Sequence, residues 1–102
     1  MFTEKLRSLL RIGSFSTRYK DVFDMYYLSY YVDTERLVDC IHQIIIWDEK
    51  MRENSIGDIV KRVKATFNNK TYRSKIEKSQ KNWIDEDLDI VFERIVDFLQ
   101  GL

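Results

Sequence analysis

Large apolar residues recur every three or four positions along most of the chain, the spacing that places side chains on one face of an α-helix. The β-branched run at residues 44–46 would also suit a strand, but it lies inside a long helical pattern and has no partner strand elsewhere. We therefore expect an all-α fold in which residues 1–102 form one domain, a single compact bundle of five to six helices, irregular rather than up-and-down. The pattern predicts helices over residues 3–12, 18–31, 34–52, 55–67 and 70–82, and a last helix whose apolar stripe runs over residues 88–99.

Polar residues and single glycines mark the expected helix ends. Gly13 follows the first helix, where a C-cap favours a positive φ angle. Ser16 or Thr17 is expected to cap the second helix, and Asp33 or Thr34 the third. Ser55 or Asp58 is expected to start the fourth.

The second helix carries aromatic residues on most of its sides. This distribution is typical of a helix buried against several neighbours, so we expect it to be the central one. Its aromatic residues are Phe23, Tyr26, Tyr27, Tyr30 and Tyr31.

Composition excludes several classes of protein. No apolar run approaches the roughly 20 residues needed to cross a bilayer, and the charged N-terminal segment lacks the apolar core of a secretory signal. A single cysteine, Cys40, excludes an internal disulfide and fits a reducing compartment, so we expect a cytoplasmic protein. Cys40 and His42 are two residues apart and would point to opposite sides of a helix, so they could not share a metal ion. We expect Cys40 in the core and His42 partly exposed.

The 17 basic and 17 acidic residues cancel in number but are unevenly distributed. Residues 61–82 are strongly basic and residues 83–102 strongly acidic, so the two blocks could pair with each other or face different partners. Phe67, Tyr72 and Trp83 are interleaved with the basic block, as in surfaces that track phosphates and stack bases, which suggests RNA binding. The other interpretation is a solvated face that pairs with the acidic last helix. The basic residues of the RNA hypothesis are Lys61, Arg62, Lys64, Lys70, Arg73 and Lys75.

Two aspartates at the start of the second helix are the clearest candidates for chemistry. Asp21 and Asp24 are three residues apart and share one helix face. A structural role is available, since Asp21 complements the helix dipole and Asp24 has i,i+4 spacing to Lys20. Asp24, however, falls among aromatic residues on a helix expected to be buried, where a carboxylate is costly unless it is paired or lies at a cleft. Arg18 lies beside the two aspartates in sequence, and Lys5 is one short helix away.

The segment around these aspartates resembles a known family. Residues 3–6 read TEKL, residues 11–13 read RIG, and residues 16–28 read STRYKDVFDMYYL. This order is similar to the C-terminal half of the AbiEii/AbiGii-type nucleotidyltransferase toxins, where an A-E-K-L helix leads through an R-G…T-R-x-K/R-D connection into a D-x-x-D-x-Y-x-L helix. A looser likeness continues through FERIVDFL at residues 92–99. The resemblance covers nearly the whole chain, and its specific part is residues 3–28.

The resemblance implies that the chain is the helical part of a two-part enzyme of abortive-infection or toxin–antitoxin type. In the family, a polymerase-β-like N-terminal half holds Mg²⁺ and a nucleoside triphosphate with a Gly-Ser element and a D-x-D carboxylate pair, and the helical half adds a lysine and an aspartate. Lys5 matches the lysine, and Asp21 or Asp24 matches the aspartate. Arg18 and Lys20 would be auxiliary phosphate contacts. The implied partners are the missing nucleotidyltransferase half or an antitoxin-like protein, and RNA, because some family members modify tRNA ends.

The chain also departs from the family pattern. No D-x-D precedes Lys5, and the acidic triplets at 85–87 and 87–89 fall at a predicted helix start, where N-capping explains them. Without a carboxylate pair the two-metal scheme cannot be assembled. We therefore expect a truncated, detached C-terminal segment that binds no metal or cofactor and is inactive alone. The alternative function is a stand-alone helical module that binds a protein partner. Loss of a catalytic half would uncover apolar surface around Phe2, Leu6 and the tyrosines, which favours self-association.

Overall fold

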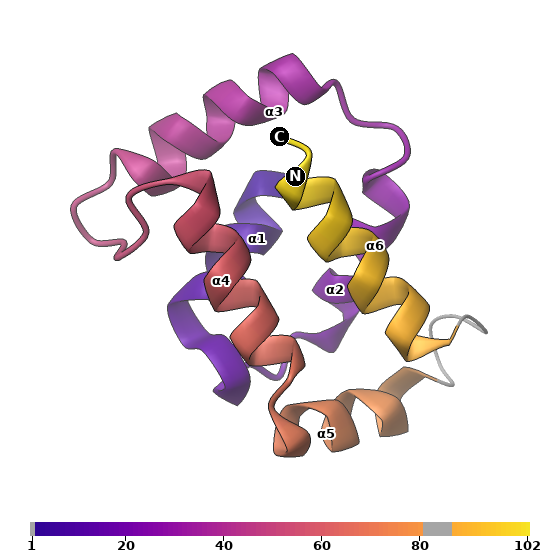
Figure 1. The fold of residues 1–102 in the computed structure, drawn as a ribbon. Helices are drawn as coiled ribbons and strands as arrows, with labels where there is room; N and C mark the ends of the chain where they lie inside the picture. The colour runs from indigo at the N-terminus through magenta and orange to yellow at the C-terminus, as the bar shows by residue number, and fades with distance from the viewer. Residues whose placement is uncertain (1, 81–86) are drawn as a thin grey trace.

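The computed structural model describes residues 2–80 and 87–102, and every regular element within these ranges is helical (Figure 1). A short 3₁₀ turn, Gly13–Phe15, follows the first helix, and a π-helical turn, His42–Ile46, follows the third. The predicted all-α fold is confirmed. The α-helices are α1 Phe2–Ile12, α2 Tyr19–Leu28, α3 Thr34–Ile41, α4 Ile56–Phe67, α5 Lys70–Gln80 and α6 Leu88–Gln100.

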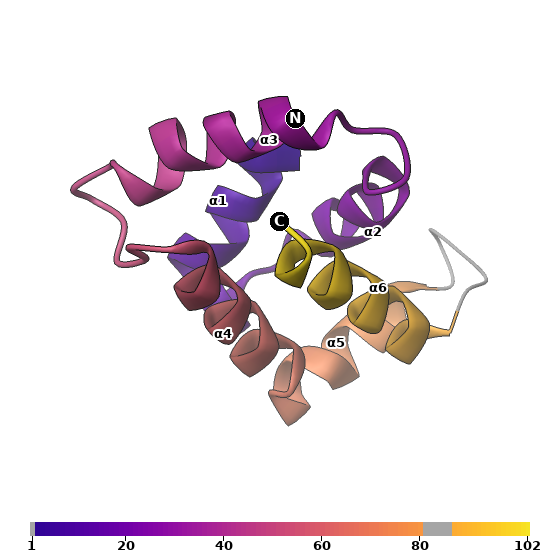
Figure 2. The same cartoon turned by 45° about the horizontal axis from the view of Figure 1, so that its top comes forward.

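The helices enclose one core. Helices α4 and α6 pack against each other, α1 and α2 pack together behind them, and α3 and α5 lie across opposite ends of the bundle (Figures 1 and 2). Each of these helices sends a fully buried aliphatic side chain into the centre, so the interior is continuous from one end to the other. These side chains include Leu6, Met25, Ile41, Ile59, Ile76 and Ile95.

Stacked aromatic rings hold the end of the bundle where α5 crosses. The rings of Phe67 and Phe92 lie parallel with centroids 4.0 Å apart, and they join α4 to α6. Tyr72 of α5 lies 6.4 Å from both rings and meets the edge of Tyr19 at 5.8 Å. This contact explains how α5, which has few apolar residues, is attached to the core.

Most predicted helix caps are confirmed. Gly13 has a φ angle of 65°, a region in which only glycine is unstrained. Asp33 accepts hydrogen bonds from backbone amides in the first turn of α3, and Ser55 does so for α4. Asp87 accepts from the amide of Asp89 at 2.8 Å, so the 87–89 triplet caps α6 as predicted. Trp83 lies outside the described residues, and so do the first two residues of the triplet at 85–87.

The second helix is shorter than the predicted 18–31 span, and its aromatic residues are less buried. It begins after Arg18, because the buried hydroxyl of Ser16 accepts the Arg18 amide at 3.3 Å and holds the preceding backbone in a turn. The Ser16 or Thr17 cap was therefore a wrong prediction. Three of the five aromatic residues are exposed. Tyr27, within α2, is 49% exposed, and Tyr30 and Tyr31, which follow the end of the helix at Leu28, are 55% and 84% exposed.

The third helix was predicted to run to residue 52, but α3 ends at Ile41 and the π-helical turn ends at Ile46. The wide turn closes with a hydrogen bond from the Trp47 amide to the His42 carbonyl at 2.8 Å. Arg7 of α1 donates to the Ile44 carbonyl at 2.9 Å and pairs with Asp48 at 2.8 Å. These contacts of Arg7 are tertiary, because they join α1 to a turn that is distant in sequence. The spacing of apolar residues therefore could not predict that the third helix ends early.

Two further burial predictions were wrong. Cys40 is exposed, because the core-facing stripe of α3 passes through Leu37 and Ile41 and leaves Cys40 beside it. Phe2 and Leu6 are buried rather than uncovered, and Phe98 of α6 packs against the Phe2 ring with centroids 5.5 Å apart. The tyrosine part of that prediction is confirmed, since Tyr27, Tyr30 and Tyr31 are exposed. The prediction that His42 is partly exposed is confirmed.

Candidate functional site

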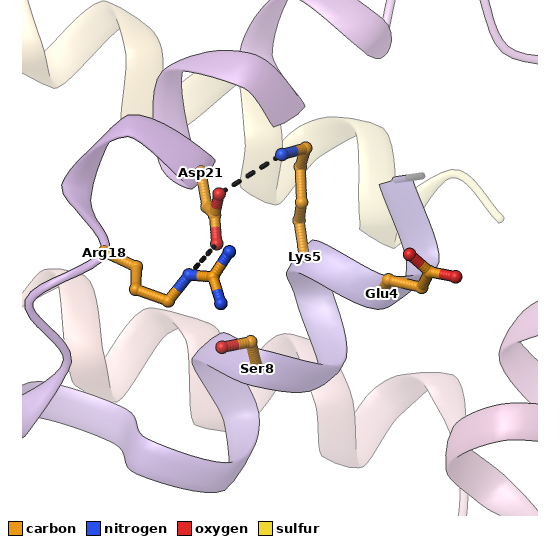
Figure 3. A pocket seen from close by; sticks show the side chains of 5 residues that line it. All are labelled: Glu4, Lys5, Ser8, Arg18 and Asp21. Carbon is orange, nitrogen blue, oxygen red and sulfur yellow. Dashed lines mark hydrogen bonds and ion pairs between the residues drawn. The ribbon is translucent and has the colours of Figure 1, made fainter.

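Lys5 of α1 lies between two carboxylates of α2. Its Nζ atom is 3.2 Å from Asp21 Oδ1 and 3.1 Å from Asp24 Oδ2. The structure thus brings together the three residues that the sequence singled out, and Figure 3 shows the Lys5–Asp21 contact from close by. We call these three residues the lysine cluster.

The connection between α1 and α2 creates this arrangement. Three features reverse the chain within a few residues: the positive φ of Gly13, the 3₁₀ turn that begins at this glycine, and the hydrogen bond that Ser16 accepts from the Arg18 amide. The first turn of α2 is thereby packed beside the first half of α1. Because α-helical residues three apart share a face, both aspartates then point at Lys5.

The two aspartates differ in their surroundings. The Asp21 side chain is 11% exposed, and its second oxygen, Oδ2, lies 2.9 Å from Arg18 Nε, so each oxygen faces a different cation. The Asp24 side chain is 32% exposed and contacts Lys5 through one oxygen. Asp21 is therefore held in place, whereas Asp24 remains accessible from solvent.

The lysine cluster keeps its amine charged. Burial opposes protonation of Lys5, but the hydrogen bonds to Asp24 and Asp21, together with their charges, outweigh burial and raise its pKa above the ordinary value of 10.5. At neutral pH the cluster therefore presents an ammonium group between two carboxylates.

A small cavity of about 220 Å³ opens beside the cluster (Figure 3). Arg18 lines the cavity, but Lys20 and Asp24 do not. Ser8 follows Lys5 by three residues, a spacing that places both on one face of α1 and that could have indicated Ser8 from the sequence. Glu4 is adjacent to Lys5, and its spacing gives no such signal. The lining residues are Glu4, Lys5, Ser8, Arg18 and Asp21.

Two of the three aromatic side chains of the RNA hypothesis lie in the core, among the residues that the structure describes. Phe67 and Tyr72 are 3% and 1% exposed, because both rings belong to the aromatic stack that joins α4, α5 and α6. They are not available to stack on bases. Trp83 lies outside the described residues.

Two of the basic residues are engaged within the protein. Arg62 lies 3.3 Å from Glu53 and donates to the Leu10 carbonyl at 3.2 Å, so it ties α4 to the end of α1. Arg73 pairs with Asp89 at the start of α6, which is the pairing of basic and acidic blocks that the second interpretation predicted. The remaining four residues of the RNA hypothesis are exposed on α4 and α5: Lys61, Lys64, Lys70 and Lys75.

The described residues offer no ready metal site. No group of three or more histidine, cysteine, aspartate or glutamate side chains comes together within residues 2–80 and 87–102. Over the same ranges, each helix is too short or too polar to cross a bilayer.

The sequence matches a known protein family. A family model described as nucleotidyl transferase AbiEii toxin, Type IV TA system, matches residues 1–99. No curated protein and no solved structure matches the chain.

Proposed function

The chain belongs to the AbiEii nucleotidyl transferase toxin family, and on this premise we propose that it is the helical accessory part of a toxin, supplying Lys5 and two aspartates to a nucleotide site that a catalytic core completes. The observation that carries the proposal is the convergence of Lys5, Asp21 and Asp24 beside a cavity. These side chains come from two helices that pack together, and they are the residues that match the family motif.

The geometry divides the roles within the lysine cluster. Lys5 would neutralise the charge that develops on the triphosphate leaving group during transfer. Asp21 is a positioning residue, because it is buried and held by both Lys5 and Arg18. Asp24 is the more exposed carboxylate and would accept the proton of the attacking hydroxyl if that group came within about 3 Å. Arg18 would contact a phosphate.

The Mg²⁺ and the nucleoside triphosphate that the family implies are assigned to the catalytic core. Both aspartates of the cluster contact the Lys5 ammonium, whose positive charge would repel a divalent cation placed between them. No third acidic group joins them within the described ranges. The residues present therefore do not fit a metal site, and we propose that this chain transfers no nucleotide by itself.

Complementation tests the proposal. A separately supplied core with the Gly-Ser element and the D-x-D pair is mixed with this chain, and incorporation of a labelled nucleotide is measured. We expect Lys5→Ala to lower incorporation by about 100-fold, as for loss of a group that stabilises transition-state charge. Lys78→Ala is the matched control, because Lys78 is exposed on α5 and should leave incorporation unchanged. Equal incorporation with Lys5→Ala and wild type, both folded by circular dichroism, would reject the proposal.

A second candidate function is a module that binds a protein partner, such as the antitoxin that a toxin–antitoxin family implies. It is favoured by large apolar side chains that are exposed away from the lysine cluster, since such residues are enriched at interfaces. Phe15 is 87% exposed and Trp47 is 68% exposed. In this case Phe15→Ser and Trp47→Ser should weaken binding to the antitoxin, whereas Lys5→Ala should not change it.

A further inference from the structure

Another cavity lies at the C-terminal end of α1, outside the lysine cluster. It measures about 420 Å³, within the range of about 300–1,000 Å³ that is typical of ligand pockets. The 3₁₀ turn that follows α1 packs against α4 (Figure 1), and both segments line the cavity. We call it the Phe15 cavity. The lining residues on which the argument depends are Ile12, Phe15, Arg52, Arg62, Ala65 and Thr66.

The turn holds the Phe15 ring in solvent at this cavity. Phe15 is 87% exposed, and Ile12, which also lines the cavity, is 47% exposed. The backbone around the ring is fixed, because Gly13 has a φ angle of 65° and the amide of the buried Ser16 donates to the Gly13 carbonyl at 3.0 Å. A large ring on a backbone that is already fixed loses little conformational freedom when a partner covers it, so Phe15 suits the role of an interface anchor.

The charge around the cavity is positive. Arg52 and Arg62 line it, and its lining residues, as far as the structure describes the chain, include no carboxylate. Arg62 is paired with Glu53 at 3.3 Å, so its charge is neutralised within the protein. Arg52 is exposed and has no ion-pair partner among the described residues. The same holds for Arg11, which lines a smaller neighbouring cavity together with Arg52. Two arginines are therefore available to acidic groups of a ligand.

We propose that the Phe15 cavity binds an acidic peptide segment of a protein partner. An apolar side chain of the peptide enters the cavity between Phe15 and α4, and a neighbouring carboxylate pairs with Arg52. Charge complementarity selects the acidic segment, since the planar guanidinium group of an arginine binds a carboxylate through two parallel hydrogen bonds. This inference lies beyond the nucleotide site of the proposed function, and it supplies the chemistry of the partner that the second candidate function requires.

A single-stranded nucleic acid is the other acidic chain that arginines and an exposed ring attract. The shape of the cavity favours the peptide. Ile12, Ala65 and the Phe15 ring give it apolar walls, which take up a side chain. Bases instead stack on open rings along a groove in which several cations follow the phosphates.

Selection from a phage-displayed library of random peptides, with this chain as the target, tests the proposal. We expect the enriched peptides to combine a large apolar side chain with a net negative charge. The affinity of one labelled, enriched peptide is then measured by fluorescence polarisation. Phe15→Ser should weaken its binding by about 30-fold or more, the loss expected for an anchor residue of an interface. Arg52→Gln should weaken it by about five-fold, the size of a strong exposed ion pair.

Two exposed residues outside the cavity provide matched controls. Tyr31→Ser removes a ring that is 84% exposed, and Arg36→Gln removes an arginine whose side chain is 89% exposed. Both variants should bind the peptide like wild type. Circular dichroism verifies that all four variants are folded.

The proposal is overturned if no peptide is enriched, if the enriched peptides are not acidic, or if either Phe15→Ser or Arg52→Gln binds like wild type. A short oligouridine that displaces the peptide from wild type at physiological salt would assign the cavity to RNA and would also overturn it.

Lys5→Ala separates this inference from the proposed function. Lys5 does not line the Phe15 cavity, so this variant should bind the peptide like wild type. If Lys5→Ala lowers nucleotide incorporation but no peptide is enriched, the nucleotide site stands and the peptide site fails. If the peptide binds as expected but Lys5→Ala transfers normally, the peptide site stands and the proposed function fails.

Discussion

Lys5 shows how much one side chain depends on residues that are distant in sequence. The pairing of Asp21 and Asp24 on one helix face could be predicted from their spacing alone. Their contact with Lys5 could not, because it depends on the turn after Gly13 and on the packing of α1 against α2. The family resemblance named the three residues, and the fold placed them within hydrogen-bond distance.

The raised pKa of Lys5 makes a prediction about stability at alkaline pH. Its pKa in the folded protein lies above the ordinary 10.5, so the stability it contributes is fully present below pH 10.5 and is lost as pH rises through the folded pKa. We expect the free energy of unfolding of wild type, from urea titrations between about pH 8 and pH 11, to fall more steeply than that of Lys5→Met.

Comparison with Lys5→Met is necessary because a second group also titrates in this range. Burial raises the pKa of Tyr72 above its ordinary 10.0, so stability from Tyr72 is lost over the same alkaline range. Lys5→Met retains that loss, and the difference between the two proteins isolates Lys5. Lys78→Met, an exposed lysine on α5, should follow wild type. Parallel curves for Lys5→Met and wild type would show that the Lys5 contacts do not stabilise the fold.

At the scale of elements, Arg94 of α6 joins its helix to the end of α2. Its Nε and Nη2 atoms donate to the hydroxyl and carbonyl of Ser29 at 3.1 and 3.0 Å. Its guanidinium group lies 4.2 Å from the centre of the Tyr30 ring. The Ser29 hydroxyl in turn donates to the Tyr26 carbonyl at 2.6 Å. The periodicity predicted a helix to residue 31, and these contacts explain why the chain leaves the helix three residues earlier.

Arg94→Lys should therefore lower the free energy of unfolding by about 1–3 kcal/mol. A lysine cannot reproduce two parallel hydrogen bonds or lie flat on a ring, and the buried Ser29 carbonyl would lose a charged donor. Urea denaturation followed by circular dichroism measures the change. Arg36→Lys, on an exposed arginine, should stay within about 0.5 kcal/mol of wild type. If both variants match wild type, Arg94 does not hold the two helices together.

At the scale of the molecule, three helices meet in the aromatic stack rather than through their charges. Phe67 and Phe92 stack at 4.0 Å and Tyr72 lies beside them, all within the core. The Arg73–Asp89 pair that links α5 to α6 is exposed on its Asp89 side, and exposed ion pairs contribute about 1 kcal/mol or less. Burial of the rings is therefore the stronger of the two links between these helices.

Phe67→Ala should destabilise the protein by about 3–5 kcal/mol, because it removes a buried ring and leaves a cavity among three helices. Since small domains are stable by about 5–15 kcal/mol, the loss should appear as a large shift of one cooperative urea transition. Phe15→Ala removes the same side chain from a position that is 87% exposed and should hardly shift the transition. Similar midpoints for the two variants would contradict the role of the stack.

The sequence by itself determined the local features of this protein. These features arise from hydrogen bonds and periodicity within a few residues. They are the helical character of the chain, the glycine turn, the shared face of Asp21 and Asp24, and the helix caps at Asp33, Ser55 and Asp87. Tertiary structure alone decided which side chains are covered and which charges meet. The exposed tyrosines, the exposed Cys40, the π-helical turn and the Phe15 cavity depend on segments far apart in the chain, because burial and ion pairing are set by whatever packs opposite a residue.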